Sequence, residues 1–511
     1  MANLCVPALL LALLQLALSQ TPSVVIHTRN GGVRGTVEEI SGSTFTSFKG
    51  IRFAQPPGGS LRFRPPQPIG NWHGVLDATT FAPICPQTLT SYIPAAAAND
   101  THMLDEDCLH LNIYVSGDVA QNRSELLPVM LYIHSGGLTI GTARSYPGDL
   151  LVTQAEPIIL VTIQYRLGIF GFFSSGDGEI PGNAGFLDQR LAMQWVQDNI
   201  EAFGGDRSRV TVFGLSAGAQ SVLMHLVSAQ SAGLFQRAIV DSCQVTGRYR
   251  ELDTYEWYYY QLARTKFNCS PGDELRCLQR LPWQSLVNDA SFSVVIDGEF
   301  LVDQPRELFR AGRFHRDVDV VIGFTNDDGY HPDIVQFLIG SDILTNGVAD
   351  PFVTDHVLEV ALAFTISETS NAVMNPDRAF KATRNGEVPL NHGHIKTMLR
   401  SQYTSRDALR NARLLLDAQR DAWYVAFSLW TAAQLAARDV NVYVYSFNHR
   451  SANLGVTPAG AVQLGAPHGH QELYIFGEVM PEYLGSQQYT AEETALSRVM
   501  MRTWTTFAAT G

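Results

Sequence analysis

The segment RVTVFGLSAG, residues 209–218, passes from an apolar run into a serine that stands between two glycines. Its first half has the β-branched and aromatic content of a buried strand, and residues 217–229 have the pattern of a helix. Ser216 therefore lies where a strand turns directly into a helix. So tight a turn strains the serine backbone, and Gly214 and Gly218 are needed because side chains there would collide with neighbouring backbone. The pattern predicts a nucleophilic serine above the edge of a sheet.

Other apolar runs end in turns and alternate with helical patterns. These runs cover residues 128–137, 157–166, 317–329 and 440–447. Each run is almost continuously apolar and does not alternate with polar residues, as expected of strands that are covered on both faces. Helical spacing marks residues 185–205 and 406–439. The alternation predicts an α/β fold with a large central, mostly parallel sheet and helices on both faces, in which ligands bind beyond the carboxyl ends of the strands.

Hydrogen-bond donors for a reaction at Ser216 follow the run at 128–137. A serine hydroxyl is a poor nucleophile near neutral pH, and the oxyanion that forms when it attacks a carbonyl needs donors. Gly136 and Gly137 can turn their N–H groups inward, and the N–H of Ala217 directly follows the serine. These three groups are the predicted oxyanion hole.

A base and an acid follow two further strands. His468 and His470 come after the run at 440–447, and histidine can take a proton and return it near neutral pH. Asp327 and Asp328 end the run at 317–329. The chain order serine, acid, histidine is that of α/β-hydrolases.

A metal site is an alternative interpretation of the histidine segment. His468, His470 and Glu472 could form a ligand cluster, but no second group of His or Cys has recognisable ligand spacing, and the serine turn would be unexplained. We therefore expect neither a metal nor a cofactor.

The ends and the charge of the chain limit its location and partners. Residues 1–19 predict a signal peptide, with an apolar run from Ala8 to Leu18 and the small residues Ala17 and Ser19 at its end. No later stretch is apolar enough to span a membrane, so we expect a secreted protein with residues 20–511 as one domain. The net charge of −13 and the lack of a basic run argue against nucleic acid.

Cysteine usage fits an oxidising compartment. Five cysteines remain after the predicted signal peptide: Cys85, Cys108, Cys243, Cys269 and Cys277. Pairing within the two short loops, 85 with 108 and 269 with 277, is the economical arrangement, although four cysteines allow three connectivities. Sequons predict glycans at Asn99, Asn122 and Asn268.

The sequence resembles the type-B carboxylesterase and cholinesterase family of α/β-hydrolases from about residue 25 to the end. Beyond the serine turn, the segments that carry the resemblance are 48–57 (FKGIRFAQPP), 106–115, 164–173, 182–206, 295–300 and 468–477 (HGHQELYIFG). The long match at 182–206, followed by the serine turn, is highly specific.

The resemblance implies one role for each candidate residue. The triad is Ser216, Asp328 and His468, and the oxyanion donors are Gly136, Gly137 and Ala217. Asp328 is preferred to Asp327 because the family acid immediately precedes the glycine, and His468 is preferred to His470 because Gly469 follows it. The resemblance also implies the two short disulfides and a free Cys243.

Some positions depart from the family pattern. Ser135 replaces the first of three loop glycines, Leu138 follows them in place of phenylalanine, and Leu215 and Gln471 stand where Glu is usual. The tryptophan that seats choline in cholinesterases is missing from the stretch before Cys108, and the acyl-pocket positions are Asn288 and Ala290. We therefore expect a serine carboxylesterase that hydrolyses neutral esters through an acyl-enzyme and does not act on choline esters.

Two other functions remain open. The family also contains adhesion and binding proteins that have lost the chemistry, although all three triad positions here carry competent residues. A lipase that acts on lipid esters is the second alternative. The chain stops at TTFAATG, residues 505–511, where family members usually continue, so we expect a truncated C-terminus.

Overall fold

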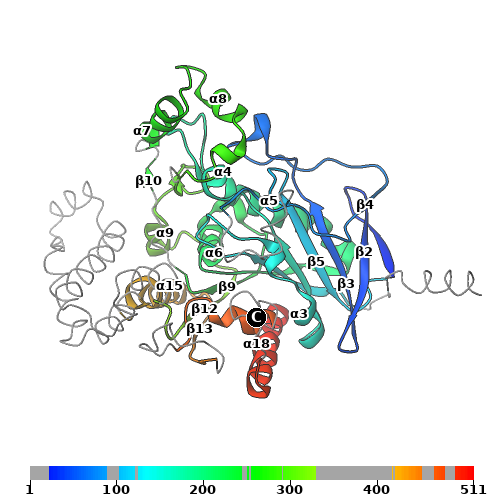
Figure 1. Ribbon diagram of the computed structural model, residues 1–511. Helices are drawn as coiled ribbons and strands as arrows, with labels where there is room; N and C mark the ends of the chain where they lie inside the picture. The colour runs from blue at the N-terminus through cyan, green and yellow to red at the C-terminus, as the bar shows by residue number, and fades with distance from the viewer. Residues whose placement is uncertain are drawn as a thin grey trace, which may run out of the picture.

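One large mixed sheet organises the protein (Figure 1). The computed structural model describes residues 22–88, 103–120, 125–243, 250–251, 255–289, 292–329, 417, 420–451, 465–477 and 489–511. Within them the strand order is β1-β2-β3-β5-β7-β6-β8-β9-β12-β13, with β4 beside β2. Pairs from β1 to β7 are antiparallel and those from β7 to β13 are parallel, so that, with β2–β4, six of ten pairs are parallel. The predicted α/β fold with a mostly parallel sheet is confirmed.

The strands of this sheet are β1 (Ser23–His27), β2 (Gly32–Ile40), β3 (Ser43–Arg52), β4 (Val75–Asp77), β5 (His110–Ser116), β6 (Leu127–Ile133), β7 (Ile159–Ile163), β8 (Gly205–Leu215), β9 (Arg237–Asp241), β12 (Asp319–Thr325) and β13 (Val442–Phe447). A separate parallel pair joins β10 (Arg250–Glu251) to β11 (Val295–Ile296). The helices are α3 (Asp149–Gln154), α4 (Gly168–Phe172), α5 (Ala184–Asn199), α6 (Ala217–Val227), α7 (Tyr255–Tyr260), α8 (Glu274–Arg280), α9 (Pro305–Ala311), α15 (Ala426–Ala436), α16 (His470–Phe476) and α18 (Ala491–Thr510). Short 3-10 or π-helical segments are η1 (Gly59–Leu61), η2 (Ala143–Ser145), η3 (Ile200–Phe203), η4 (Ala229–Ser231), η6 (Gln261–Lys266), η7 (Trp283–Ser285) and η9 (Arg420–Val425).

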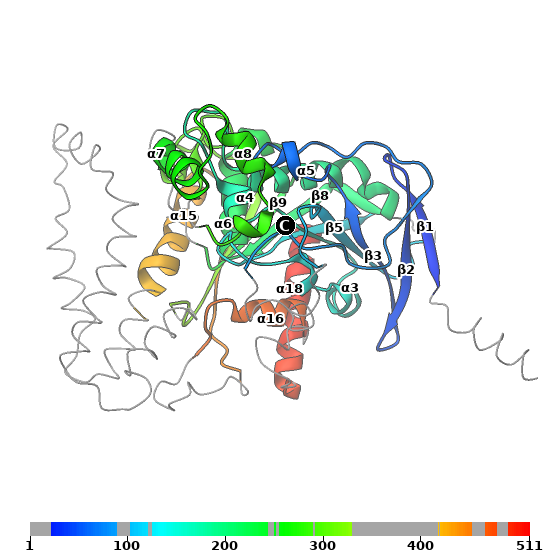
Figure 2. The same cartoon turned by 45° about the horizontal axis from the view of Figure 1, so that its top comes forward.

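Two hydrophobic cores lie on opposite faces of the sheet. Side chains alternate along β6, so Val129, Leu131 and Ile133 enter one core and Met130 and Tyr132 enter the other. Helices α5, α6, α9 and α15 cover the first core, and α3, α16 and α18 cover the second (Figure 2). Burial on both faces explains why the central strands are continuously apolar in sequence.

The predicted strand runs correspond to β6, β7, β8, β12 and β13, and the helix predicted at 185–205 corresponds to α5 with η3. Of the helix predicted at 406–439, only residue 417 and residues 420–439 are described, and they form η9 and α15. The antiparallel strands at the other edge were not predicted. Strand β2 is partly exposed and β5 carries polar side chains, so neither has the continuous apolar pattern.

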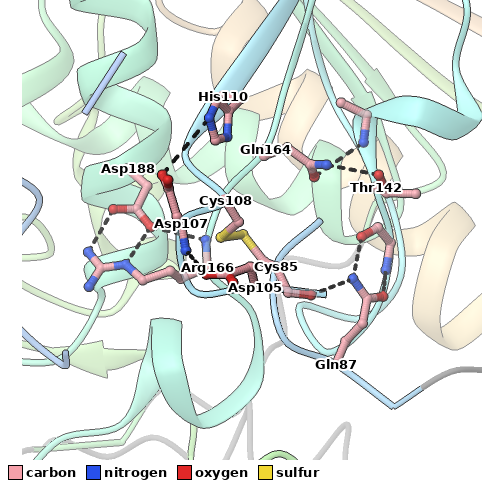
Figure 3. Close-up of a disulfide and its surroundings, with 12 residues drawn as sticks. Cys85, Gln87, Asp105, Asp107, Cys108, His110, Thr142, Gln164, Arg166 and Asp188 are labelled. Carbon is pink, nitrogen blue, oxygen red and sulfur yellow. Dashed lines mark hydrogen bonds and ion pairs between the residues drawn. A yellow bond between two sulfur atoms is a disulfide. The ribbon is translucent and has the colours of Figure 1, made fainter. Parts of the chain in front are cut away.

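The Arg166–Asp188 ion pair joins the end of β7 to α5 inside the protein (Figure 3). Arg166 Nε and Nη2 donate to the two carboxylate oxygens of Asp188 at 2.8 and 2.7 Å, and the Arg166 backbone N–H donates to Asp188 Oδ2 at 3.0 Å. The two side chains are only 3% and 0% exposed. A buried charge pair of this kind is costly to break by removal of one partner.

Both predicted disulfides are present, Cys85–Cys108 and Cys269–Cys277, and Cys243 is free and buried. Of the predicted glycan sites, Asn268 is exposed beside the second disulfide, whereas Asn99, Asn122 and the predicted signal peptide lie outside the described residues. Among the described helices, none combines the length and apolar character that crossing a membrane requires.

We expect Asp188→Ala to lower the free energy of unfolding by about 3–5 kcal/mol, because Arg166 is left buried without its anion. Asp198→Ala on the same helix is the matched control, since Asp198 pairs with Arg29 at the surface, and such pairs contribute about 0–1 kcal/mol. Urea denaturation of both variants measures the difference. Equal decreases in the free energy of unfolding would show that the buried pair stabilises the protein no more than the surface pair does.

Candidate active site

Ser216 occupies a strained turn between β8 and α6. Its backbone angles are φ 55° and ψ −117°, a region that residues with a side chain rarely adopt. The Ser216 N–H donates to the carbonyl of Asp241 at the end of β9 at 2.9 Å, and the Ser216 carbonyl accepts from Gln220 at 2.8 Å. The turn is therefore held by the neighbouring strand and by the first turn of the helix.

The two flanking glycines are required by close packing. A Cβ on Gly218 would lie 2.0 Å from the carbonyl oxygen of Ile133, and one on Gly214 would lie 2.6 Å from the carbonyl carbon of Gly218. No larger residue fits without moving backbone. The start of α6 consequently sits directly against the carboxyl end of β6.

The loop after β6 carries the predicted oxyanion donors. Gly136 and Gly137 have φ of 111° and 64°, in the region that favours glycine. A Cβ on Gly136 would lie 2.0 Å from the carbonyl oxygen of Ile140, whose N–H donates to the Gly136 carbonyl at 3.0 Å. Because this loop starts at Ile133, the structure brings it beside the Ser216 turn. Ala217 is the first residue of α6, where backbone N–H groups lack helical partners.

Gln87 ties the far end of this loop to the first disulfide (Figure 3). Its amide donates to the carbonyl of Gly141 at 2.9 Å and accepts from the Gly141 N–H at 2.7 Å. Gln87 stands two residues after Cys85, whose carbonyl also accepts from the Gln87 amide. Sequence reasoning missed this residue, because no local pattern reveals a contact across 54 positions.

Asp328 and His468 form a hydrogen-bonded pair. His468 Nδ1 donates to Asp328 Oδ1 at 2.7 Å, and the two side chains are 9% and 0% exposed. The second oxygen, Asp328 Oδ2, accepts from Ser242 Oγ at 2.7 Å and from the Thr325 N–H at 2.8 Å. The carboxylate is thus fixed on both sides, and it fixes which nitrogen of His468 faces away from it.

The histidine segment lies against the serine turn. Gly469, with φ 81°, approaches so closely that a Cβ there would lie 3.0 Å from Leu215 Cδ2, and Leu215 directly precedes Ser216. The ring of Tyr424 lies 4.7 Å from the His468 ring. The Ser216 turn, the Gly136–Gly137 loop and Asp328 therefore follow the carboxyl ends of β8, β6 and β12, and His468 lies beside them.

The alternative candidates from the sequence, His470, Asp327 and Glu472, have other partners. His470 packs against Phe447 and Tyr474, and burial lowers its pKa to about 4. Asp327 accepts from the Gly465 N–H, and Glu472 accepts from two tyrosines. Within the described ranges, no group of three His, Cys, Asp or Glu side chains is arranged to hold a metal ion.

Two neighbours of the acid were not foreseen from the sequence. Ser242 links Asp328 to Gln471, whose amide donates to Ser242 Oγ at 3.0 Å. Asp241 precedes Ser242 and accepts from Tyr445 at 2.6 Å. The sequence did carry a signal for Asp241 and Ser242. They end the apolar segment RAIVDS, and ligands of such sheets bind at the carboxyl ends of the strands.

The predicted acyl-pocket positions are described in part. Asn288 is exposed and its side-chain oxygen accepts from Thr88 at 2.8 Å, whereas Ala290 lies outside the described residues. The stretch before Cys108 in which cholinesterases carry tryptophan is also largely outside them, at residues 89–102.

Comparison with known proteins agrees with this architecture. Residues 22–511 match the model of the carboxylesterase family. The acetylcholinesterase of Bungarus fasciatus is 33% identical over 513 residues, which cover 95% of this chain and 78% of that protein. The acetylcholinesterase of Electrophorus electricus is 33% identical over 543 residues, covering 98% of this chain and 82% of that protein. The resemblance seen in the sequence is thereby confirmed, and this chain belongs to the carboxylesterase family.

Proposed function

We propose that this protein is a serine carboxylesterase with Ser216, His468 and Asp328 as its triad. The observation that carries the proposal is the buried His468–Asp328 hydrogen bond, which lies beside a serine in a strained strand-to-helix turn. A structural role alone gives no reason to hold an imidazole and a carboxylate together at such a turn. Membership of the carboxylesterase family supports the same reaction class.

In the proposed reaction Ser216 Oγ attacks the ester carbonyl while His468 Nε2 takes its proton. The oxyanion accepts from the N–H groups of Gly136, Gly137 and Ala217. His468 then protonates the leaving alkoxide, and water, activated by the same nitrogen, releases the acid from the acyl-enzyme. Asp328 keeps the imidazole in one tautomer and stabilises its cationic form.

The proposed substrate is a neutral ester. Support comes from the first disulfide, because the stretch between Cys85 and Cys108 contains no tryptophan that could seat a quaternary ammonium. We also propose that residues 1–19 direct secretion and that residues 20–511 belong to one α/β-hydrolase domain. Two disulfides support an oxidising compartment.

The protonation of Asp241 is expected to influence stability. Burial raises its pKa to about 7, the hydrogen bond from Tyr445 opposes the rise, and the charge of Asp328 adds to it. The side-chain pKa of an aspartate in an unfolded chain is about 4. The folded state therefore keeps a proton that the unfolded state has lost between these two values, so stability falls as pH rises through this range and then levels off.

Replacement of the nucleophile tests the reaction. Ser216→Ala should reduce hydrolysis of p-nitrophenyl acetate by about 10⁴-fold or more and abolish labelling by a fluorophosphonate probe, because Ser216 Oγ is the proposed acceptor of the acyl group. Ser208→Ala, at an exposed serine of β8, is the control and should retain both. A wild-type protein that neither hydrolyses esters nor becomes labelled would instead be a binding module.

A charged and a neutral ester of the same shape test the substrate proposal. Acetylcholine and its carbon isostere 3,3-dimethylbutyl acetate should have kcat/KM values within about threefold of each other, since no tryptophan stands between Cys85 and Cys108 to seat the cation. The assay is run at about 1 M salt, where the Debye length of about 3 Å removes long-range attraction. A preference for acetylcholine above about tenfold would contradict the neutral-ester proposal.

Asp241→Asn isolates the pH effect. The free energy of unfolding of the wild type, minus that of the variant, should fall by about 1.4 kcal/mol per pH unit between about pH 5 and 6.5 and level off above about pH 7. Urea titrations of both proteins at each pH measure this difference, in which the other titrating groups cancel. Parallel curves would mean that Asp241 is ionised throughout.

A further inference from the structure

Another buried acid, Glu472, lies near the candidate active site. The carboxyl of Glu472, on α16, accepts at Oε1 from the Tyr132 hydroxyl and at Oε2 from the Tyr146 hydroxyl, the latter at 3.3 Å. Glu472 is 4% exposed, and within the described ranges no arginine or lysine pairs with it. Burial raises the pKa of Glu472 well above its usual range, and the two tyrosine hydroxyls satisfy its oxygens in the absence of a cation.

The rings around Glu472 form one cluster, which we call the aromatic cluster. Its members are Tyr132, Tyr146, Phe213 and Phe476. The Tyr132 ring lies 4.5 Å from Tyr146 and 4.9 Å from both phenylalanines. Tyr132 is on β6, which leads into the oxyanion loop, Phe213 is on β8, which leads to Ser216, and Phe476 is on α16, which follows His468. The cluster therefore joins the three segments that carry the proposed machinery.

A hydrogen-bond chain connects Glu472 to the oxyanion loop. Tyr146 gives its one hydroxyl proton to Glu472, so Ser135 Oγ donates to the Tyr146 oxygen at 3.1 Å. Ser135 directly precedes Gly136, and its carbonyl accepts from His134 Nδ1 at 2.9 Å. The peptide whose N–H belongs to Gly136 is thus held on its carbonyl by His134 and through the Ser135 side chain by Tyr146.

We propose that Glu472 is a positioning residue for ester hydrolysis: through Tyr146 and Ser135 it fixes the oxyanion-loop peptide relative to the helix that follows His468. This inference rests on the proposed function. Donors that are preorganised toward the oxyanion lower the barrier, whereas a small misplacement loses most of that benefit. Glu472 would therefore affect turnover more than substrate binding.

Two substitutions at Glu472 separate its polar contacts from its volume. Glu472→Leu suits the apolar cluster but removes both acceptors, and kcat for p-nitrophenyl acetate should fall at least about tenfold with KM changed less than about threefold. Glu472→Gln keeps an acceptor and a donor and should restore kcat to within about threefold of the wild type. Failure of glutamine to restore kcat in a folded protein would overturn the proposal.

Two matched tyrosine variants test whether Glu472 acts through the hydrogen-bond chain to Ser135. They also test the positioning role if Glu472→Leu does not fold. Tyr146→Phe breaks the chain to Ser135 and should lower kcat as Glu472→Leu does, whereas Tyr132→Phe removes a similar hydroxyl bond without touching Ser135 and should leave kcat within about threefold. The Tyr146→Phe and Glu472→Leu effects should not add in the double variant. Equal effects of the two tyrosine variants, or losses confined to KM or to the melting temperature, would show a merely structural acid.

The hydrolysis and labelling assays distinguish failure of the proposed function from failure of the positioning role of Glu472. A wild-type protein without hydrolysis or fluorophosphonate labelling overturns the proposed function, and the positioning role falls with it. A wild type that hydrolyses the ester while Tyr146→Phe keeps full kcat overturns only the role of Glu472.

Discussion

The contact between Gly218 and the carbonyl of Ile133 constrains the whole candidate site. At that point a helix begins against the end of a neighbouring strand, at a distance that leaves no room for a Cβ. The contact fixes the first turn of α6 relative to β6, and therefore fixes the Ala217 N–H relative to the loop that starts after Ile133. A donor set drawn from two chain segments can only be preorganised if those segments are locked together, and a glycine is what permits the lock.

The two faces of the sheet support the site in different ways. On the face of α5 and α6, aliphatic side chains of β6, β7 and β8 form the larger core. On the face of α16 and α18, Tyr132 and Phe213 alternate with those side chains and form the aromatic cluster with Glu472. Because neighbouring residues of one strand serve both cores, a change in either core is transmitted to the strand ends where Ser216 and the oxyanion loop lie.

The parts of the site that were predicted share one property: each comes after an apolar run in the sequence and carries a local signal. Ser216 has its glycines, and strand ends in a parallel sheet predict one shared edge for it, an acid and a histidine. The family resemblance was needed to choose Asp328 and His468 from their neighbours Asp327 and His470. Gln87, Ser242 and the partners of Glu472 were not predicted, because their roles depend on contacts between residues far apart in sequence. The antiparallel strands β1 to β3 were missed because partial exposure removes the continuous apolar pattern.

The carboxylate in direct contact with the imidazole is that of Asp328. The positions where glutamate is usual in the family are occupied by Leu215 and by Gln471, whose amide binds Ser242. Two further buried carboxyls lie close by: burial raises the pKa of Asp241 to about 7 and that of Glu472 well above its usual range. The imidazole is therefore oriented by direct contact with one carboxylate, whereas Glu472 reaches the Ser135 backbone only through the hydroxyl of Tyr146.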